Sequence, residues 1–238
     1  MARAQRILLI GTGGLGSPAA LVLARAGIGT LALIDDDYVS VENLHRQILH
    51  RTWEIGHPKV ESAARAIARI APRLQVIALK ERFFPERARE LVRQFDVVLD
   101  GADNFATKFL VNDACVIEGI PFVHAGAIRW SGQLLPVRPG APCYRCLFEE
   151  QPPQTAGTSC REAGVVGPVV GVIGALQAEA ALALLDATPE TTTDESILTI
   201  YDGLTGRLRQ VRFQKNPFCR VCVSGTLLPT EAYPVAAC

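Results

Sequence analysis

The sequence lacks an excess of charge of either sign, an uninterrupted apolar segment of membrane-spanning length, and the even cysteine count typical of a disulfide framework. Its 238 residues contain 24 lysines and arginines against 24 aspartates and glutamates, so the formal net charge is zero. A balanced charge gives no reason to expect nucleic acid or an anionic membrane as a partner. Any cationic binding site must therefore be local.

No segment has the features of a signal peptide, because the first residues lead into the apolar run Ile7–Ile10, which ends at a glycine turn instead of a cleavage site. The longest apolar stretch, residues 165–185, contains Pro168 and carries Gln177 and Glu179. We expect a buried helix there, not a membrane span. These features predict a cytoplasmic protein with no membrane partner.

The seven cysteines are an odd number, and four of them form two C-x-x-C pairs, Cys143 with Cys146 and Cys219 with Cys222, separated by 72 residues. In a reducing compartment such pairs are metal ligands or redox centres. A redox pair normally opens a helix of a thioredoxin-like unit, and we expect neither pair to open one. We therefore predict a tetrahedral four-thiolate Zn²⁺ site, which leaves no position for a reacting water and is structural.

What the sequence does have is a core-forming composition, 49% apolar and 20% charged, and an alternation of strand and helix patterns. We expect strands at residues 6–10, 30–34, 74–79, 96–100 and 121–124, and helices at 15–26, 58–70, 85–94 and 107–118. This rhythm of nearly continuous apolar strands and helices predicts an α/β fold with a Rossmann-like, doubly wound, mostly parallel sheet.

The second half of the chain has a different pattern. A strand candidate at 133–138 could continue the sheet in the antiparallel sense, and residues 171–185 form a helix pattern. Residues 197–201 and 208–213, with glycines between them, predict a terminal hairpin. The polar segment 149–159, rich in Pro, Gly and Thr, predicts a loop.

A glycine-rich loop, G-T-G-G-L-G at residues 11–16, follows the first predicted strand and opens the first helix. Glycines at Gly11, Gly13 and Gly14 let a phosphate approach backbone N–H groups at a helix N-terminus. Asp35, at the end of the second strand, is placed to accept hydrogen bonds from a ribose hydroxyl. The alternative is a glycine turn that serves packing only. The strand, the helix and Asp35 in this order favour a nucleotide site.

Two cations follow, Arg46 in the run that begins at Asn43, and Lys59. NAD is the usual ligand of the glycine fingerprint, but several cations beyond the phosphate loop suit a triphosphate better. Taken alone, each cation would be expected to be solvated surface charge. Asp103, just beyond the fourth strand, is placed for a Mg²⁺ ligand, and it or Asn104 could instead cap the next helix.

These motifs, in this order, resemble the ThiF/MoeB/HesA family, the bacterial relatives of ubiquitin-activating enzymes, and are most similar to ThiF. The matching segments cover nearly the whole chain and lie at residues 11–50 (with DDDYVSVENLHRQILH), 58–63 (PKVESA), 97–104 (VVLDGADN), 143–147 (CYRCL) and 160–178 (CREAGVVGPVVGVIGALQA). The resemblance implies one adenylation domain over residues 1–238. A nucleotide-binding Rossmann part would span 1–138 and a zinc-stapled, carrier-docking part 139–238.

The activity that the resemblance implies is an adenylyltransferase reaction with ATP and Mg²⁺. The C-terminal glycine carboxylate of a ubiquitin-like sulfur-carrier protein, ThiS- or MoaD-like and ending in Gly-Gly, would attack the α-phosphate and give an acyl-adenylate and pyrophosphate. A sulfur donor would then convert the adenylate to a thiocarboxylate for thiamine or molybdopterin biosynthesis. A homodimer is the family expectation.

Carried over position by position, the resemblance assigns ATP contacts to Gly11, Gly13, Gly14, Asp35, Asn43, Arg46, Lys59, Asp103 and Asn104. Arg46 and Lys59 would stabilise charge in the transition state, and Asp103 would bind Mg²⁺. Cys160 matches a cysteine that in ThiF-like proteins links covalently to the activated carrier, and the alternative for it is a small buried apolar group.

One departure concerns the N-terminus. Family members usually begin with a helical arm that brings an arginine to the partner subunit's ATP, whereas this sequence begins directly before the first strand. That arginine is expected to be absent, to be replaced poorly by Arg3 or Arg6, or to precede the recorded start. Three other functions stay open: an NAD-dependent oxidoreductase, an inactive carrier-binding relative, and activation of a tRNA carbonyl, against which the neutral charge speaks.

Overall fold

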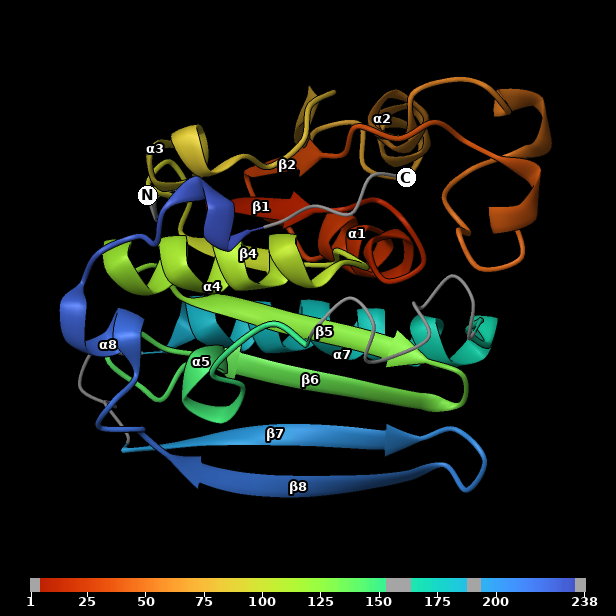
Figure 1. Ribbon diagram of the computed structural model, residues 1–238. Coiled ribbons are helices and arrows are strands. Elements are labelled where there is room, and N and C mark those ends of the chain that lie inside the picture. The colour runs from red at the N-terminus through yellow and green to blue at the C-terminus, as the bar shows by residue number, and fades with distance from the viewer. Residues whose placement is uncertain (1–4, 153–163, 188–193, 234–238) are drawn as a thin grey trace.

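The computed structural model describes residues 5–152, 164–187 and 194–233. Their strands form one eight-stranded sheet in the order β3-β2-β1-β4-β5-β6-β7-β8 (Figure 1). The strands are β1 Arg6–Ile10, β2 Thr30–Ile34, β3 Gln75–Leu79, β4 Val97–Asp100, β5 Phe122–Ile128, β6 Ser131–Val137, β7 Glu195–Asp202 and β8 Arg207–Gln214. The α-helices are α1 Gly16–Arg25, α2 Lys59–Ile70, α3 Pro85–Val92, α4 Phe105–Glu118, α5 Tyr144–Leu147, α7 Gly167–Asp186 and α8 Arg220–Ser224, and the 3₁₀ turns are η1 Val41–Asn43, η2 Thr52–Glu54 and η3 Thr230–Ala232.

The first five strands of the chain pair in parallel, and the last three are antiparallel. Ile10 at the end of β1 pairs with Ile34 of β2 on one side and with Asp100 of β4 on the other. The chain turns from β5 into β6 through Arg129 and Trp130, and Arg129 has a positive φ of 52°. The predicted Rossmann-like, doubly wound sheet with antiparallel C-terminal strands is confirmed. Its strand order reverses between β1 and β4, where ligands bind in such sheets.

Both faces of the sheet are covered, because successive side chains of a strand point to opposite faces. Leu9 and Leu33 pack with α1, α2 and α7 on one face, and Leu8 and Ile34 pack with α3 and α4 on the other. Figure 1 shows α4 in front of the sheet and α7 behind it. The parallel strands β1, β2 and β4 are therefore buried on both sides, as their continuous apolar sequences predicted.

Helix α7 has the length and the apolar composition of a membrane span, and no other helix among the described residues has both. One side of it packs against α1 and the sheet, with Val169, Ile173 and Ala178 buried. The buried Gln177 donates hydrogen bonds through Nε2 to the carbonyls of Asp100 and Val123 at 2.8 and 2.9 Å. The predicted helix is confirmed, and it starts four residues earlier, at Gly167.

Strand β5 is also longer than the sequence indicated. The prediction ended at His124, whereas β5 continues to Ile128 because β6 pairs with it as far as Ile128 and Ser131. The terminal hairpin is confirmed as β7 and β8, which pair along eight residues each. Strand β8 forms one edge of the sheet and carries arginines at 207, 209 and 212, and such charges discourage pairing with another sheet edge.

Candidate functional site

The glycine loop packs directly against the loop that follows β4. Gly11 has a φ of +85°, and a Cβ there would lie 2.9 Å from the carbonyl oxygen of Gly101. A Cβ on Gly16 would lie 2.0 Å from the carbonyl oxygen of Gly11, so the first turn of α1 also needs glycine. These close approaches hold the helix N-terminus at the point where the strand order reverses.

Asp35 is fastened to the glycine loop at the carboxyl end of β2. The backbone N–H and the hydroxyl of Thr12 donate to Asp35 Oδ2 at 2.8 and 2.9 Å. The N–H of Asp37 donates to the other oxygen, Oδ1, at 3.0 Å. The carboxylate thus has one fixed orientation beside the loop, as a ribose-binding carboxylate requires.

The turn that begins at Asn43 places two side chains beside the glycine loop. The carbonyl of Asn43 accepts the N–H groups of Arg46 and Gln47 at 3.1 and 3.0 Å. The Arg46 stem lies 3.4 Å from the place of a Cβ on Gly14, and Gln47 Nε2 lies 3.4 Å from that of Gly13. Side chains at Gly13 and Gly14 would meet these neighbours, so glycine leaves room at the mouth of the loop.

Gln47 was not among the predicted site residues, although it stands in the N-L-H-R-Q run. Its side chain is 4% exposed, and its Oε1 has no hydrogen-bond partner in the described part of the chain. A buried amide oxygen without a partner is rare. The Gln47 amide is therefore a further polar group available to a ligand in this loop.

Lys59 is the first residue of α2 and is only 4% exposed. Its Nζ donates to Asp37 Oδ2 at 2.6 Å. The alternative that Lys59 is solvated surface charge is therefore wrong. Burial at the start of α2 places an ammonium group close to the end of β2, where Asp35 is also found.

Asp103 and Asn104, two polar residues of the loop after β4, have different environments. Asn104 Oδ1 accepts the N–H of Thr107 at 2.9 Å and caps α4. Asp103 precedes the cap and is exposed, two residues beyond Gly101, which packs on the glycine loop. Because Asn104 is the cap, the Asp103 carboxylate is available to a cation at this edge of the sheet.

A buried cluster of charged residues lies below that loop, and the sequence pattern did not reveal it. His124 Nδ1 is 2.7 Å from Asp100 Oδ2, Lys108 Nζ is 3.4 Å from the same oxygen, and Lys108 also donates to the Ala125 carbonyl. Burial opposes ionisation of Asp100, but Lys108 and His124 hold its pKa below the usual value. Burial lowers the pKa of His124, and Lys108 adds to this effect. The cluster fixes the end of β4 under the site.

The four predicted metal ligands converge at the opposite end of the sheet. Cys143 Sγ lies 3.9, 3.7 and 3.4 Å from the sulfurs of Cys146, Cys219 and Cys222, and Cys146 lies 3.8 Å from Cys222. Four sulfurs at about 2.3 Å from a tetrahedral zinc would be about 3.8 Å apart, whereas a disulfide needs about 2.0 Å. Hydrogen bonding among the sulfurs, with Cys143 the largest contributor, lowers the pKa of Cys146 and of Cys219. The donor set fits zinc.

One reason given for zinc was wrong. Cys143 and Cys219 are the N-cap residues of α5 and α8, so each pair does open a helix. These helices have four and five residues and are too short to give a periodic sequence pattern. The convergence of both pairs on one point supports a shared metal better than two separate redox centres.

The first cysteine knuckle is held by a buried ion pair. Arg145 donates through Nε and Nη2 to the two oxygens of Asp113 at 2.7 and 2.8 Å, and the Tyr233 hydroxyl donates to Asp113 Oδ2 at 2.7 Å. Arg145 is 5% exposed and Asp113 is fully buried. Asn112 accepts the N–H of Tyr144 at 2.8 Å. Helix α4 thus fixes both the knuckle and the C-terminal segment.

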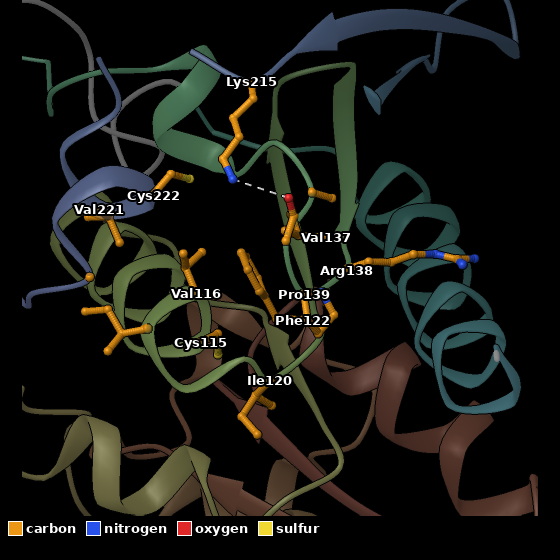
Figure 2. Close-up of a pocket in the computed structure, with 14 residues that line it drawn as sticks. Cys115, Val116, Ile120, Phe122, Val137, Arg138, Pro139, Lys215, Val221 and Cys222 are labelled. Carbon is orange, nitrogen blue, oxygen red and sulfur yellow. Dashed lines mark hydrogen bonds between the residues drawn. The ribbon is translucent and has the colours of Figure 1, made fainter. Parts of the chain in front are cut away.

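A cavity of about 170 Å³ lies beside this cysteine cluster, between α4, the end of β6 and α8 (Figure 2). Val116, Phe122 and Val221 line it, and at its rim Lys215 Nζ donates to the Gly140 carbonyl at 3.4 Å. Cys222 contributes to its wall. The cavity is therefore part of the cysteine end of the molecule and lies apart from the glycine loop.

Three sequence predictions fall wholly or mostly on residues that the structure does not describe, and one of them is the loop at 149–159, of which residues 153–159 lie outside the described part. Cys160 and Arg3 lie outside the described residues, so their roles stay predictions. Arg6 lies at the amino end of β1, where its N–H donates to Asp96 and its guanidinium donates to the Gln94 carbonyl. Arg6 therefore lies at the end of β1 that is away from the glycine loop of the same chain.

Comparison with known proteins gives consistent results. A family model described as the ThiF family matches residues 1–221. The chain is 44% identical over 231 residues to adenylyltransferase and sulfurtransferase uba4 of Aspergillus niger, covering 92% of this chain and 48% of the relative. It is 39% identical over 221 residues to the SAMP-activating enzyme E1 of Haloferax volcanii, covering 93% of this chain and 81% of the relative. It thus spans about half the length of the fungal relative.

The fold also matches solved structures. The structure of E. coli MccB with MccA-N7isoASN superimposes with a TM-score of 0.77 at 22% identity, covering 92% of this chain and 67% of MccB. At this identity the likeness concerns the fold.

Proposed function

The chain belongs to the ThiF family, and from this premise we propose that it uses ATP to activate the C-terminal carboxylate of a ubiquitin-like sulfur-carrier protein as an acyl-adenylate. The names of the uba4 and SAMP-activating relatives support adenylyl transfer and carrier activation. The observation that carries the proposal is that the glycine loop, the Arg46 turn and the loop bearing Asp103 meet where the strand order reverses.

The chemistry explains why cations are needed at this place. A carboxylate that attacks the α-phosphate of ATP brings two anions together, and preorganised positive charge offsets their repulsion. Arg46 beside Gly14 and the buried Lys59 would supply it. Asp35, oriented by Thr12, would accept the ribose hydroxyls.

Asn43, Asn104 and the glycines would complete the nucleotide contacts. Asp103 would hold Mg²⁺, which would neutralise part of the triphosphate charge. The four clustered cysteines would hold one structural Zn²⁺.

The finer assignments are part of the same proposal. The carrier would be ThiS- or MoaD-like with a Gly-Gly end, and its thiocarboxylate would supply sulfur for thiamine or molybdopterin biosynthesis. Residues 1–138 would bind the nucleotide and residues 139–238 would dock the carrier within one domain. The enzyme would act as a cytoplasmic homodimer, and Cys160 would link covalently to the activated carrier.

A pyrophosphate-exchange assay tests the proposal. ATP, Mg²⁺ and a Gly-Gly-ended carrier should give exchange of label between pyrophosphate and ATP, and a carrier without its Gly-Gly end should give none. Absence of exchange with all Gly-Gly-ended carriers tested would end the proposal. Tight NAD binding without ATP binding would favour an oxidoreductase, and carrier binding that ATP does not strengthen would favour an inactive relative.

A further inference from the structure

A buried chain of polar side chains joins the glycine loop to the start of α2. His50 is 5% exposed, with Nε2 3.1 Å from the Thr12 carbonyl oxygen and Nδ1 2.8 Å from the Ser62 hydroxyl. Ser62 is fully buried, and its hydroxyl oxygen also lies 2.8 Å from Glu54 Oε2. Apolar side chains would fill this space without orienting their neighbours, so the polar chain calls for an explanation.

At the loop end, the chain fixes one peptide group. A carbonyl only accepts hydrogen bonds, so His50 Nε2 carries a proton and donates it to Thr12. The Ser17 hydroxyl donates to the same carbonyl at 3.2 Å. The N–H and hydroxyl of Thr12 both point to Asp35. His50 thus holds the carbonyl of Thr12, and the N–H and hydroxyl of Thr12 orient Asp35.

At the helix end, the chain reaches the segment that carries Lys59. Ser62 stands three residues after Lys59, which places both in the first turn of α2. Glu54 also accepts the Arg65 guanidinium at 3.1 Å and the Arg51 N–H at 3.2 Å. Helix α2 is therefore anchored at Ser62 and Arg65. His50, which contacts both Ser62 and Thr12, helps to fix the position of Lys59 relative to the glycine loop.

We propose that His50 is a positioning residue of the nucleotide site, which sets the glycine loop, Asp35 and the start of α2 in one fixed arrangement. This inference rests on the proposed function, because it assumes that ATP binds at the glycine loop. In this proposal His50 does not touch ATP or any other reacting group. Its contribution is to hold Thr12, and through Thr12 the carboxylate that would meet the ribose.

The test compares His50→Leu and His50→Gln with the wild type by calorimetric titration with ATP·Mg²⁺ and with 2′-deoxy-ATP·Mg²⁺. His50→Leu removes the donor to Thr12 and should weaken ATP binding about tenfold, the equivalent of one well-placed hydrogen bond. It should also bring the affinities for ATP and the deoxy analogue closer, because Asp35 loses its orientation. The amide of His50→Gln can still donate to Thr12, and this variant should stay within about threefold of the wild type.

The matched control is Ser196→Ala, which loses one buried hydrogen bond, from the Ser196 hydroxyl to the Pro142 carbonyl at 2.7 Å, away from the glycine loop. It should lower the melting temperature and leave ATP affinity unchanged. Wild-type affinity and ribose discrimination in His50→Leu, or equal losses in the Leu and Gln variants, would overturn the inference alone. A wild-type protein that binds no ATP would overturn the proposed function and the inference together.

Discussion

Removal of the Arg145 guanidinium should strongly lower the free energy of unfolding, because this group pairs with the buried Asp113 carboxylate. Arg145→Met keeps an apolar stem over the Phe109 ring, from which the guanidinium carbon is 4.5 Å away. It leaves the buried Asp113 carboxylate with only neutral side-chain donors in the described structure, the Tyr233 hydroxyl and the Asn112 amide. Loss of one partner of a buried ion pair costs about 3–5 kcal/mol, against a total stability of about 5–15 kcal/mol for a typical domain.

Urea unfolding of the zinc-loaded protein, followed by circular dichroism, measures this loss. Arg220→Met is the matched control, because Arg220 lies between the second pair of cysteines but its ion pair with Glu150 is exposed, with side chains 67% and 71% accessible. It should change the unfolding free energy by less than about 1 kcal/mol. Adding Asp113→Asn to Arg145→Met should recover part of the loss, because a neutral amide costs less to bury than an unpaired carboxylate.

A loss below about 1 kcal/mol for Arg145→Met, or a loss equal to that of Arg220→Met, would refute the reasoning. So would a double variant less stable than Arg145→Met alone, since the argument attributes the loss to the unpaired charge of Asp113.

Three further predictions concern the nucleotide site, the metal and pH. Lys59→Met should lower the rate of pyrophosphate exchange by about 10²–10³, measured with saturating ATP and carrier, because it removes a fixed cation; an unchanged rate would exclude Lys59 from the reaction. Elemental analysis should find one zinc per chain, and chelation should lower the melting temperature of the wild type; an unchanged melting temperature would speak against a structural metal. Burial lowers the pKa of His50 and of His124 from 6.5, so below that pH the unfolded chain binds more protons than the folded one. The free energy of unfolding should therefore fall on acidification, by at most about 1.4 kcal/mol per pH unit for each histidine. Urea titrations of the wild type and of His124→Gln at several pH values check this, and equal slopes of unfolding free energy against pH would contradict it.

The sheet could be predicted closely because its strands are apolar runs with clear ends. The predicted range 30–34 is β2 itself, flanked by Gly29 and Asp35. The glycine loop and the cysteine pairs were also visible, since their chemistry lies in short spacings along the chain. The end of β5 was misjudged because residues 125–127 are alanine and glycine, which have low β-propensity, and pairing with β6 holds them in the strand.

The polar residues that support the site could not be found in this way. Lys108 stands in a helix whose sequence gives no sign that an ammonium group turns inward, and its partners Asp100 and His124 come from two different strands. In the sequence, His50 stands out only as the last residue of the segment 11–50 that resembles the ThiF/MoeB/HesA family. Its contacts with Thr12 and Ser62 join residues 38 and 12 positions away. Such pairings depend on tertiary packing, which no local pattern encodes.

The distance along the chain between the two cysteine pairs has a consequence for synthesis. Cys146 and Cys219 are separated by 72 residues, so a growing chain has the first pair, and all strands of the parallel sheet, before the second pair leaves the ribosome. A metal can be bound by all four cysteines only after Cys222 has been synthesised, so this step follows synthesis of the parallel sheet. Chains released before Cys222 would contain the glycine loop but would lack at least one of the four clustered cysteines. Such incomplete chains would be substrates for chaperones and proteases.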